Sequence, residues 1–446
     1  MSRGNLQKEV VEKRDHDEEH HHHHYHGVDS AEKHIKVDDA LNLFLRNISP
    51  VSSEVVRLED AQSRILYGEI KPRRNVPSLP RSTRDGFALK LKRGESRYSI
   101  VGDVRIGVAP KITLMEGEAV QIATGSFLPN GADAVVMKEY TTVEKLGDTP
   151  VVIINRPARK FENILRPGED MIRGKVLLER GIVIRAQHVA LASMLGVKHV
   201  RVFKRPRIAY FSTGDELIDP QKNRKEKEDG DSKYGIYDAN RPFIRSMLSE
   251  LGAEPCDLGI LRDDYEEIRE RMFFGLRGFD GLILSAGSSV GERDYVLKAA
   301  ESIRDVRILV HGVAMRPSSP TGLAVYMRRK PFILLPGFPT SAIVSFFAFA
   351  VPAIAKLSGR RSTNKVYPII NVRLADGYPG KRGVKHYVRV KVSRTNGEYV
   401  ARIVRPTEAY YSRWLAEANA IAIVDEDSSP VREGDRVPAL LIGEAG

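Results

Sequence analysis

Between residues 206 and 361 the sequence alternates between short apolar runs and amphipathic segments. Strand-like runs occur at 207–213, 281–286 and 331–337, and helical patterns occur at 241–251 and 265–276. Strands and helices that alternate at this spacing predict a parallel sheet with helices on both faces. This part of the chain is therefore expected to be a doubly wound α/β domain.

The rest of the chain divides around that domain. Residues 71–157 contain short β runs broken by Gly, Pro and Asn, which predict a small β domain inserted between segments 31–70 and 158–205. Helices are expected near 38–48 and 186–195, and Gly196 is a suitable residue to end the second one. Residues 362–446 return to a β pattern, and the charged stretch 219–235 is interpreted as an exposed loop.

Residues 1–30 are expected to be a disordered tail. Seven of the chain's twelve histidines lie between His16 and His26. Such a tract can bind transition metals, but a tail that is simply solvated is the favoured interpretation. The tract therefore does not indicate a catalytic metal site.

Composition narrows the classes of protein that remain. Cys256 is the single cysteine, so an internal disulfide and a zinc site built on thiolates are excluded. No stretch approaches 20 apolar residues and no signal-peptide pattern is present, which predicts a cytoplasmic protein. The formal net charge of +12 favours an anionic partner, either nucleic acid or a small phosphorylated ligand, and no motif supports nucleic acid.

Three expected strand ends in the α/β domain carry loops of small and polar residues. These loops read STGDEL, SAGSSVGERD and PGFPTSA, and they begin at Ser212, Ser285 and Pro336. Ligands of open α/β sheets bind beyond the carboxyl ends of the strands. Small residues let a ligand approach the backbone, whose N–H groups can hold an anion. The loops therefore predict a site for a phosphorylated ligand.

Acidic residues accompany these loops at Asp215, Glu216, Asp238 and Asp294. Bare carboxylates repel phosphate, and a divalent cation removes the conflict, since Mg²⁺ is commonly held by one or two carboxylates together with substrate phosphates. A competing interpretation makes Asp215 and Asp238 helix N-caps. Both interpretations remain open at this point.

The sequence resembles a known family. The segments DGFAL, IATGSFLPNGADAVV, NILRPGEDM, STGDEL, YDANR, SSVGERD, HGVAMRP and PGFPTSA follow one another as in the molybdopterin molybdenumtransferases, the MoeA and gephyrin E-domain family. The similarity covers about residues 35–446. It implies an elongated homodimer whose subunit has a linker domain, an inserted β domain, a molybdopterin-binding α/β domain and a C-terminal β barrel.

The resemblance also implies an activity and a set of site residues. The activity is the Mg²⁺-dependent insertion of molybdate, or tungstate, into adenylylated molybdopterin with release of AMP. The site would lie between the α/β domain of one subunit and the inserted domain of the other. The implied catalytic residues are Asp85, Thr124, Glu216, Asp238 and Asp294, with Glu216 and Asp294 as Mg²⁺ ligands. The implied substrate-binding residues are Arg166, Asp170, Thr213, Gly214, Ser285, Gly287, Ser289, Gly291, Arg316, Pro336, Gly337 and Pro339.

Some positions depart from the family pattern. Ala286 replaces a glycine, which would cost energy if the backbone there had a positive φ. Arg316 replaces one lysine and keeps the charge, whereas Ser319 replaces a second lysine and removes a charge. Arg166 and Asp170 could form a structural ion pair instead of lining a cleft. The alternative hypothesis is a paralogue that binds molybdopterin or a partner without efficient metal transfer.

Overall fold

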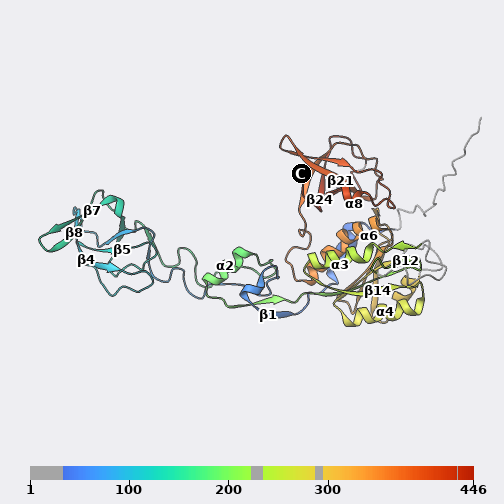
Figure 1. Cartoon of the computed structure of the whole chain (residues 1–446), viewed down its shortest axis with the longest axis horizontal. Coiled ribbons are helices and arrows are strands. Elements are labelled where there is room, and N and C mark those ends of the chain that lie inside the picture. Colours follow the sequence, from blue (N-terminus) through green and yellow to red (C-terminus); the bar gives the residue numbers. More distant parts are fainter. Residues whose placement is uncertain (1–33, 222–234, 287–294, 429, 446) are drawn as a thin grey trace, which may run out of the picture.

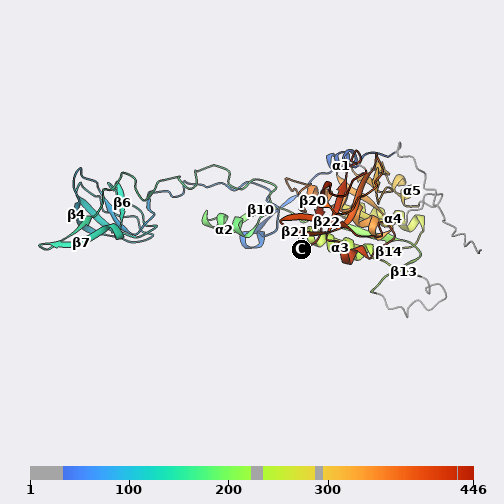
Figure 2. The same cartoon turned by 90° about the horizontal axis from the view of Figure 1, so that it is seen from above.

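The structure is a computed structural model that describes residues 34–221, 235–286, 295–428 and 430–445. The expected tail at 1–30 lies outside the described residues. The described chain is elongated (Figure 1), with a β domain at one end, a small middle region, and the α/β and C-terminal domains together at the other end. The view from above shows the same arrangement (Figure 2).

The α/β domain contains a six-stranded sheet in the order β14-β11-β15-β19-β18-β16. The strands β14, β11, β15 and β19 are parallel, but β18 runs antiparallel to both of its neighbours, so the prediction of an all-parallel sheet is wrong at this edge. The domain's strands are β11 (Arg207–Thr213), β12 (Leu217–Ile218), β13 (Ile236–Tyr237), β14 (Glu254–Leu261), β15 (Gly281–Ala286), β16 (Val306–His311), β18 (Gly322–Tyr326) and β19 (Lys330–Pro336).

Helices cover both faces of this sheet, as the alternating sequence predicts. Side chains of a strand point alternately to the two faces, and Ile208 and Tyr210 accordingly join one core while Ala209 and Phe211 join the other. The first core is closed by α1 (Val37–Arg46), α3 (Asn240–Glu250), α6 (Pro339–Ser345), the π-helix η6 (Phe346–Ala350) and α7 (Val351–Leu357). The second is closed by α4 (Tyr265–Gly278) and α5 (Tyr295–Ser302).

The helix α1 packs with the α/β domain although its sequence precedes the linker region. Val37, Ala40 and Phe44 are buried in the same core as Ile208 and Ile283. The segment 31–70 is therefore divided in space, because its first part belongs to the α/β core and only its later part forms the middle region.

One continuous helix, Pro339–Leu357, is long and apolar enough to cross a membrane. The expectation that no segment approaches that length is thus wrong for these 19 residues. However, 83% of its apolar window is buried inside the protein, where it packs in the α/β core. Such burial is typical of the core helix of a soluble protein.

The C-terminal domain is a closed barrel of five strands. The pairings run β21-β22-β20-β24-β23 and return to β21, and the short strand β17 adds to β21 at the outside. Closure leaves no free edge in the barrel. The elements are β17 (Met315–Arg316), β20 (Ile369–Leu374), β21 (Lys385–Thr395), β22 (Glu398–Ile403), α8 (Trp414–Glu417), β23 (Ala420–Val424) and β24 (Arg436–Leu441).

The inserted domain is built on a six-stranded sheet, in the order β6-β3-β5-β4-β8-β7. Its elements are β3 (Gly86–Leu89), β4 (Arg97–Val104), β5 (Glu118–Ile122), β6 (Ala134–Met137), the 3-10 helix η3 (Lys138–Tyr140), β7 (Thr141–Leu146) and β8 (Thr149–Ile154). Two antiparallel chain segments, bridged at Val76 and Met171, connect it to the middle region.

The middle region forms a small core of its own around Leu66, Ala192 and Val202. Its helix ends before Gly196, whose φ of +73° suits the glycine predicted to end it. The elements of the middle region and the arm are β1 (Ser53–Arg57), the 3-10 helix η2 (Leu58–Ala61), β2 (Arg81–Ser82), β9 (Ile164–Leu165), α2 (Ala186–Met194) and β10 (His199–Phe203).

A buried lysine joins α1 to the C-terminal barrel. The Lys385 Nζ lies 2.8 Å from Asp38 Oδ2, 3.2 Å from Asp425 Oδ1 and 3.8 Å from Glu426 Oε2, and the lysine side chain is 7% exposed. Burial acts to lower the pKa of Lys385, but the hydrogen bond to Asp38 and the surrounding carboxylates outweigh burial and raise it. The cluster thus ties the two domains together.

Replacing Lys385 should loosen this junction. We expect Lys385→Met to lower the free energy of unfolding by about 2 kcal/mol, because Asp38 and Asp425 would lose this cation and Glu426 would keep only its 3.5 Å contact with Lys36, while water partly screens the two aspartates. Since folding raises the pKa of Lys385, its contribution is complete at neutral pH and is lost only as the pH rises past the lysine range. Thermal unfolding would measure the loss, and Lys391→Met, at an exposed lysine of the same strand β21, is the control that should change little.

Candidate functional site

The three central parallel strands of the α/β sheet end level with one another. Thr213 pairs with Ala286, and Ala286 pairs with Pro336. Their loops therefore leave the sheet at one place, as the sequence predicts for a ligand site. Ala286 lies inside β15 without a positive φ, so the expected backbone cost of replacing glycine there does not arise.

The first turn of α3 meets these strand ends through Asn240. Its side-chain Nδ2 donates hydrogen bonds to Ser285 Oγ at 2.6 Å and to the Gly337 carbonyl at 2.7 Å. Asn240 is 6% exposed. One amide thus links α3 with the ends of β15 and β19, and sequence reasoning missed this residue although it lies in the YDANR segment.

Asp238 caps this turn. Its Oδ1 accepts hydrogen bonds from the backbone N–H groups of Asn240 at 2.9 Å and Arg241 at 3.2 Å. The N-cap residue of α3 is Ala239, so Asp238 stands one residue before the predicted cap position, although its side chain accepts hydrogen bonds from the first turn as a capping residue does. Its second oxygen, Oδ2, is buried without a hydrogen bond, and the nearest cation, Arg241 Nη1, is 3.9 Å away. The hydrogen bonds to the helix start therefore use Oδ1 and leave Oδ2 without a partner.

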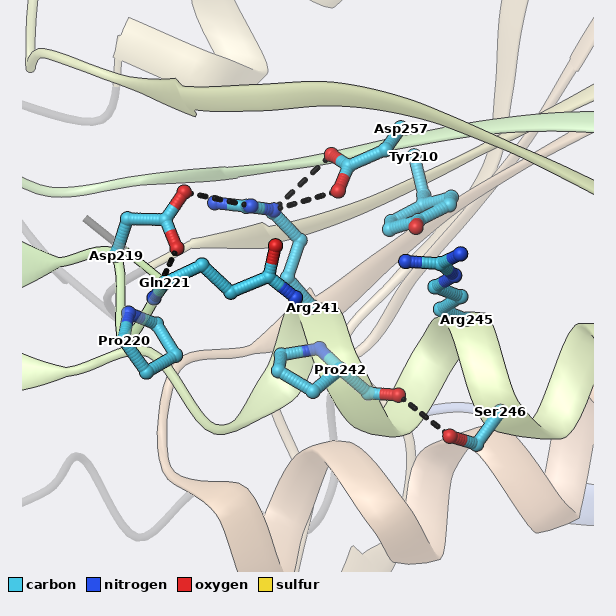
Figure 3. A pocket seen from close by; sticks show the side chains of 9 residues that line it. All are labelled: Tyr210, Asp219, Pro220, Gln221, Arg241, Pro242, Arg245, Ser246 and Asp257. Atoms are coloured by element: carbon cyan, nitrogen blue, oxygen red, sulfur yellow. Dashed lines mark hydrogen bonds and ion pairs between the residues drawn. The ribbon is translucent and has the colours of Figure 1, made fainter.

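Arg241 is held between two other carboxylates (Figure 3). Its guanidinium lies 3.0 Å from Asp219 and 3.0 Å from Asp257, and Arg245 on the same helix lies beside Tyr210. A cavity of about 290 Å³ adjoins these residues. Because the two aspartates balance the charge of Arg241, this cavity lacks the excess positive charge that a phosphate site needs.

The STGDEL loop brings Glu216 against the backbone. The Glu216 carboxylate lies 2.7 Å from where a Cβ on Gly214 would be, and Gly214 has a φ of +152°. Only glycine fits both the close contact and the backbone angle. No helix follows Asp215, because the next element is β12, so the N-cap interpretation is wrong for that residue.

Negative charge gathers at this loop. The backbone N–H of Asp263 donates to Asp215 Oδ1 at 3.3 Å. Burial raises the pKa of Asp263, and the charges of Asp215 and Glu216 raise it further. Among the described residues no three His, Cys, Asp or Glu side chains form a complete metal-binding group. The loop can therefore attract a cation, but any cation bound there would need ligands from a substrate.

The PGFPTSA loop is anchored by the C-terminal domain. Trp414 Nε1 donates to Thr340 Oγ1 at 2.8 Å, and Thr340 Oγ1 donates to the Tyr411 carbonyl at 2.9 Å. Thr340 directly follows Pro339, so the barrel holds the turn formed by Pro336, Gly337 and Pro339. Sequence reasoning missed Trp414, because it lies 74 residues away in another domain.

Arg316 and Ser319 stand at the two positions where the family pattern has lysine. Arg316 is exposed at the end of β17, which pairs with the barrel strand β21. Ser319 Oγ lies 3.3 Å from His34 Nδ1. A histidine from the segment before α1 therefore occupies the neighbourhood of the position where the family has its second lysine.

The inserted domain holds a second group of predicted residues. The Thr124 backbone N–H donates to Asp85 Oδ1 at 2.7 Å, and this hydrogen bond is the main reason that the pKa of the exposed Asp85 is lowered. A Cβ on Gly86 would lie 1.9 Å from the Val136 carbonyl, so the glycine of DGFAL is required for β3 to approach β6. Asp85 is thus an exposed carboxylate with a fixed position.

Arg166 and Asp170 lie on the arm beside this domain. Arg166 Nε is 3.6 Å from Glu169, and the Arg166 backbone N–H donates to Glu169 at 2.8 Å and lowers the pKa of that carboxyl. Arg166 therefore forms its ion pair with Glu169 and not with Asp170, which is exposed. The proposed Arg166–Asp170 pair is wrong.

Buried polar atoms without hydrogen bonds occur both at the strand ends of the α/β domain and near Asp85 in the inserted domain. Among the described residues they include Oγ of Ser212, Oδ2 of Asp238, Oδ1 of Asn240 and Nη1 of Arg241 at the strand ends. Two more, Arg81 Nε and Ser126 Oγ, lie next to the Asp85 face. Buried polar groups are normally paired, so unpaired ones in these two places mark them as sites that a ligand could complete.

One chain does not bring the two groups together. The inserted domain with β4, β5 and β8 lies at one end of the molecule, and the strand ends near β12 lie at the other (Figures 1 and 2). Four of the implied site residues lie outside the described residues, namely Gly287, Ser289, Gly291 and Asp294.

Comparison with known proteins accounts for this arrangement of domains. Residues 35–196 match the MoeA N-terminal region (domain I and II), residues 209–356 match a family described as "Probable molybdopterin binding domain", and residues 371–442 match the MoeA C-terminal region (domain IV). The chain belongs to the MoeA family. The doubly wound domain, inserted domain and terminal barrel implied by the resemblance are thereby confirmed.

Relatives from two bacteria carry the same name. The chain is 31% identical over 334 residues to the molybdopterin molybdenumtransferase of Haemophilus influenzae, which covers 74% of this chain and 80% of the relative. It is 30% identical over 415 residues to that of Staphylococcus aureus strain MSSA476, which covers 91% and 95%. As a MoeA family member, the chain is a transferase of molybdenum cofactor biosynthesis with molybdopterin as its substrate.

A solved structure gives the same result. The molybdopterin biosynthesis MoeA protein of Pyrococcus horikoshii OT3 superposes with a TM-score of 0.74 at 27% identity, covering 92% of this chain and 100% of that one. The MoeA architecture therefore extends over nearly the whole chain, from α1 to the C-terminal barrel.

Proposed function

We propose that the protein inserts molybdenum or tungsten, supplied as molybdate or tungstate, into adenylylated molybdopterin and releases AMP. The observation that carries the proposal is the group of strand ends joined by Asn240, where Ser285 and Gly337 meet a capped helix start beside the carboxylates of Asp215 and Glu216. A nucleotide-linked pterin with several phosphate oxygens suits such a place.

The chemistry demands positioning and charge balance. An oxygen of water or of the oxyanion attacks the adenylate phosphorus, and the anhydride P–O bond breaks with its electron pair passing to the molybdopterin phosphate. AMP leaves with the attacking oxygen. The two sulfurs of the dithiol then replace an oxide ligand of the metal, and the two thiol protons leave with that oxide as water. Fixed hydrogen-bond donors at the strand ends would stabilise the developing charge. Asp85, held by Thr124 and kept ionised by its lowered pKa, is suited to orient the attacking oxygen and to balance positive charge during cleavage.

Magnesium is part of this proposal. Glu216, together with Asp294, would hold Mg²⁺, which supplies positive charge to the phosphate oxygens. Burial is the main cause of the raised pKa of Asp263, and the negative charges of Asp215 and Glu216 raise it further, which supports a cation site beside these carboxylates. Incomplete protein ligation is usual for Mg²⁺, which takes its remaining ligands from substrate phosphates and water.

The functional unit is proposed to be a homodimer. The inserted domain, whose sequence includes Asp85 and Thr124, lies at the opposite end of the described chain from the α/β domain, whose sequence includes Glu216 and Asp238 (Figure 1). A two-fold symmetric pair could place the inserted domain of one subunit over the strand ends of the other. Arg166 and Asp170, on the arm next to that domain, would then approach the same cleft. We further propose that the dimer acts in the cytoplasm.

A release assay tests the proposed function. Purified protein supplied with adenylylated molybdopterin, Mg²⁺ and molybdate or tungstate should release AMP, and omission of Mg²⁺ should reduce the rate. The competing hypothesis, a molybdopterin-binding paralogue, is favoured by the lost lysine at Ser319, and it predicts binding of the compound without AMP release. Comparing the two oxyanions in the same assay identifies the metal.

The charge missing at Ser319 can be restored. We expect Ser319→Lys to strengthen molybdate binding by about threefold to tenfold, because a cation beside a bound oxyanion in a partly solvated place contributes roughly 1 kcal/mol. Titration calorimetry with molybdate would measure it. Ser319→Met is the control, since it removes the contact with His34 to the same degree but adds no charge. Equal affinities of the two variants would contradict the prediction.

A further inference from the structure

The orientation of the Asn240 amide determines the direction of the Ser285 hydroxyl. The Gly337 carbonyl can only accept a hydrogen bond, so the side of the amide that faces it must be Nδ2. The same nitrogen lies 2.6 Å from Ser285 Oγ and donates to it. The hydroxyl hydrogen of Ser285 must therefore point away from Asn240, and Ser285 Oγ makes no other hydrogen bond within the described residues.

The position of this amide is rigid. The backbone N–H groups of Asn240 and Arg241 both donate to Asp238 Oδ1. The Arg241 side chain is fastened to Asp219 and Asp257, on two other segments of the domain (Figure 3). Asn240 therefore has little freedom to turn, and neither does the hydroxyl that depends on it.

A packing role alone does not explain the arrangement. The carbonyl oxygen Oδ1 of Asn240 is buried and has no hydrogen-bond partner. An amide whose only task was to join three loops would be expected to have both ends satisfied. Here Nδ2 donates two hydrogen bonds, whereas Oδ1 accepts none. We therefore interpret the amide by the effect of Nδ2 on its two acceptors, the Ser285 hydroxyl and the Gly337 carbonyl.

We propose that Asn240 is a positioning residue that keeps the Ser285 hydroxyl available as a donor to an anionic oxygen of the substrate. The inference rests on the proposed function, because it takes the strand ends as the place where phosphate or molybdate oxygens lie. A donor directed at such an oxygen forms a charge-assisted hydrogen bond, which is stronger than one between neutral groups. Ser285 is the second-to-last residue of the strand β15 and is 2% exposed, so its hydroxyl would meet a ligand lying across the strand ends from beneath.

A double-mutant cycle tests the inference, with AMP as the probe and titration calorimetry as the measurement. Asn240→Asp keeps the size of the side chain but cannot donate, so the Ser285 hydroxyl would turn toward it. We expect Asn240→Asp and Ser285→Ala each to weaken AMP binding by about tenfold or more. The double variant should be no weaker than the single variants, because the two residues act through one hydroxyl.

Several results would overturn the inference. Losses that add in the double variant would show that Asn240 acts only on folding or packing, and an unchanged AMP affinity in either single variant would remove the role of the hydroxyl. If Asn240→Asp fails to fold, Ser285→Ala still decides, since it retains the bond from Asn240 to Gly337. Wild-type protein that neither binds AMP nor releases it would overturn the proposed function as well, whereas wild-type activity with unaffected variants would overturn only this inference.

Discussion

Two inactive variants should recover activity when their subunits share one dimer. We expect Asp85→Asn and Glu216→Gln each to reduce the rate of AMP release at least about 100-fold, because each removes a charged group from the reacting centre. The inserted domain that carries Asp85 and the α/β domain that carries Glu216 lie at opposite ends of one chain (Figure 1), so in the proposed two-fold dimer the two residues would serve the same centre from different subunits. A mixed dimer would then contain one centre with both residues intact.

The expected size of the recovery is definite. Random mixing of equal amounts makes half of the dimers mixed, and each has one intact centre of two, so the activity should reach about a quarter of the wild-type value. The two variants would be unfolded and refolded together, or coexpressed with different affinity tags, and assayed for AMP release. A chain with both substitutions, mixed with Asp85→Asn, is the control and should stay inactive. Absence of recovery would place both residues in one subunit's centre or in none.

Local patterns explain why much of the fold could be predicted from the sequence. The alternation of strands and helices led to the doubly wound domain, since side-chain periodicity records which faces are buried. It does not record strand direction, which is why the antiparallel run of β18 was missed. The location of α1 was equally hidden, because an apolar stripe around Phe44 shows that a helix packs but not against which domain.

In the candidate site, too, local features could be predicted from the sequence and contacts between distant segments could not. Glycines and capping residues act over a few positions, so the roles of Gly214 and Asp238 could be anticipated from STGDEL and YDANR. Contacts over long separations could not be anticipated. His34 meets Ser319 across 285 positions and Asn240 meets Gly337 across 97, and such pairs are decided by how whole domains pack.

Among these contacts between distant segments, the one between Trp414 and Thr340 has the largest expected effect on stability. The indole is 2% exposed and packs with Ile343 and Val404, and its N–H donates to Thr340. We expect Trp414→Ala to lower the free energy of unfolding of the α/β and C-terminal unit by about 3–5 kcal/mol, through lost burial and a residual cavity. The melting temperature of that transition should fall by at least about 5 °C.

Two matched variants separate packing from hydrogen bonding. Trp414→Phe keeps a buried six-membered ring but removes the donor to Thr340 and part of the packed indole, so it should cost about 1–2 kcal/mol, less than Trp414→Ala. Tyr410→Ala, at an exposed residue of the same segment, should change stability by less than about 0.5 kcal/mol. Because Thr340 follows the PGFPT turn directly, Trp414→Phe should also weaken AMP binding although the indole is not expected to touch the ligand. A normal AMP affinity in that variant, together with the small loss of stability, would show that the barrel stabilises the α/β domain without shaping its strand-end site.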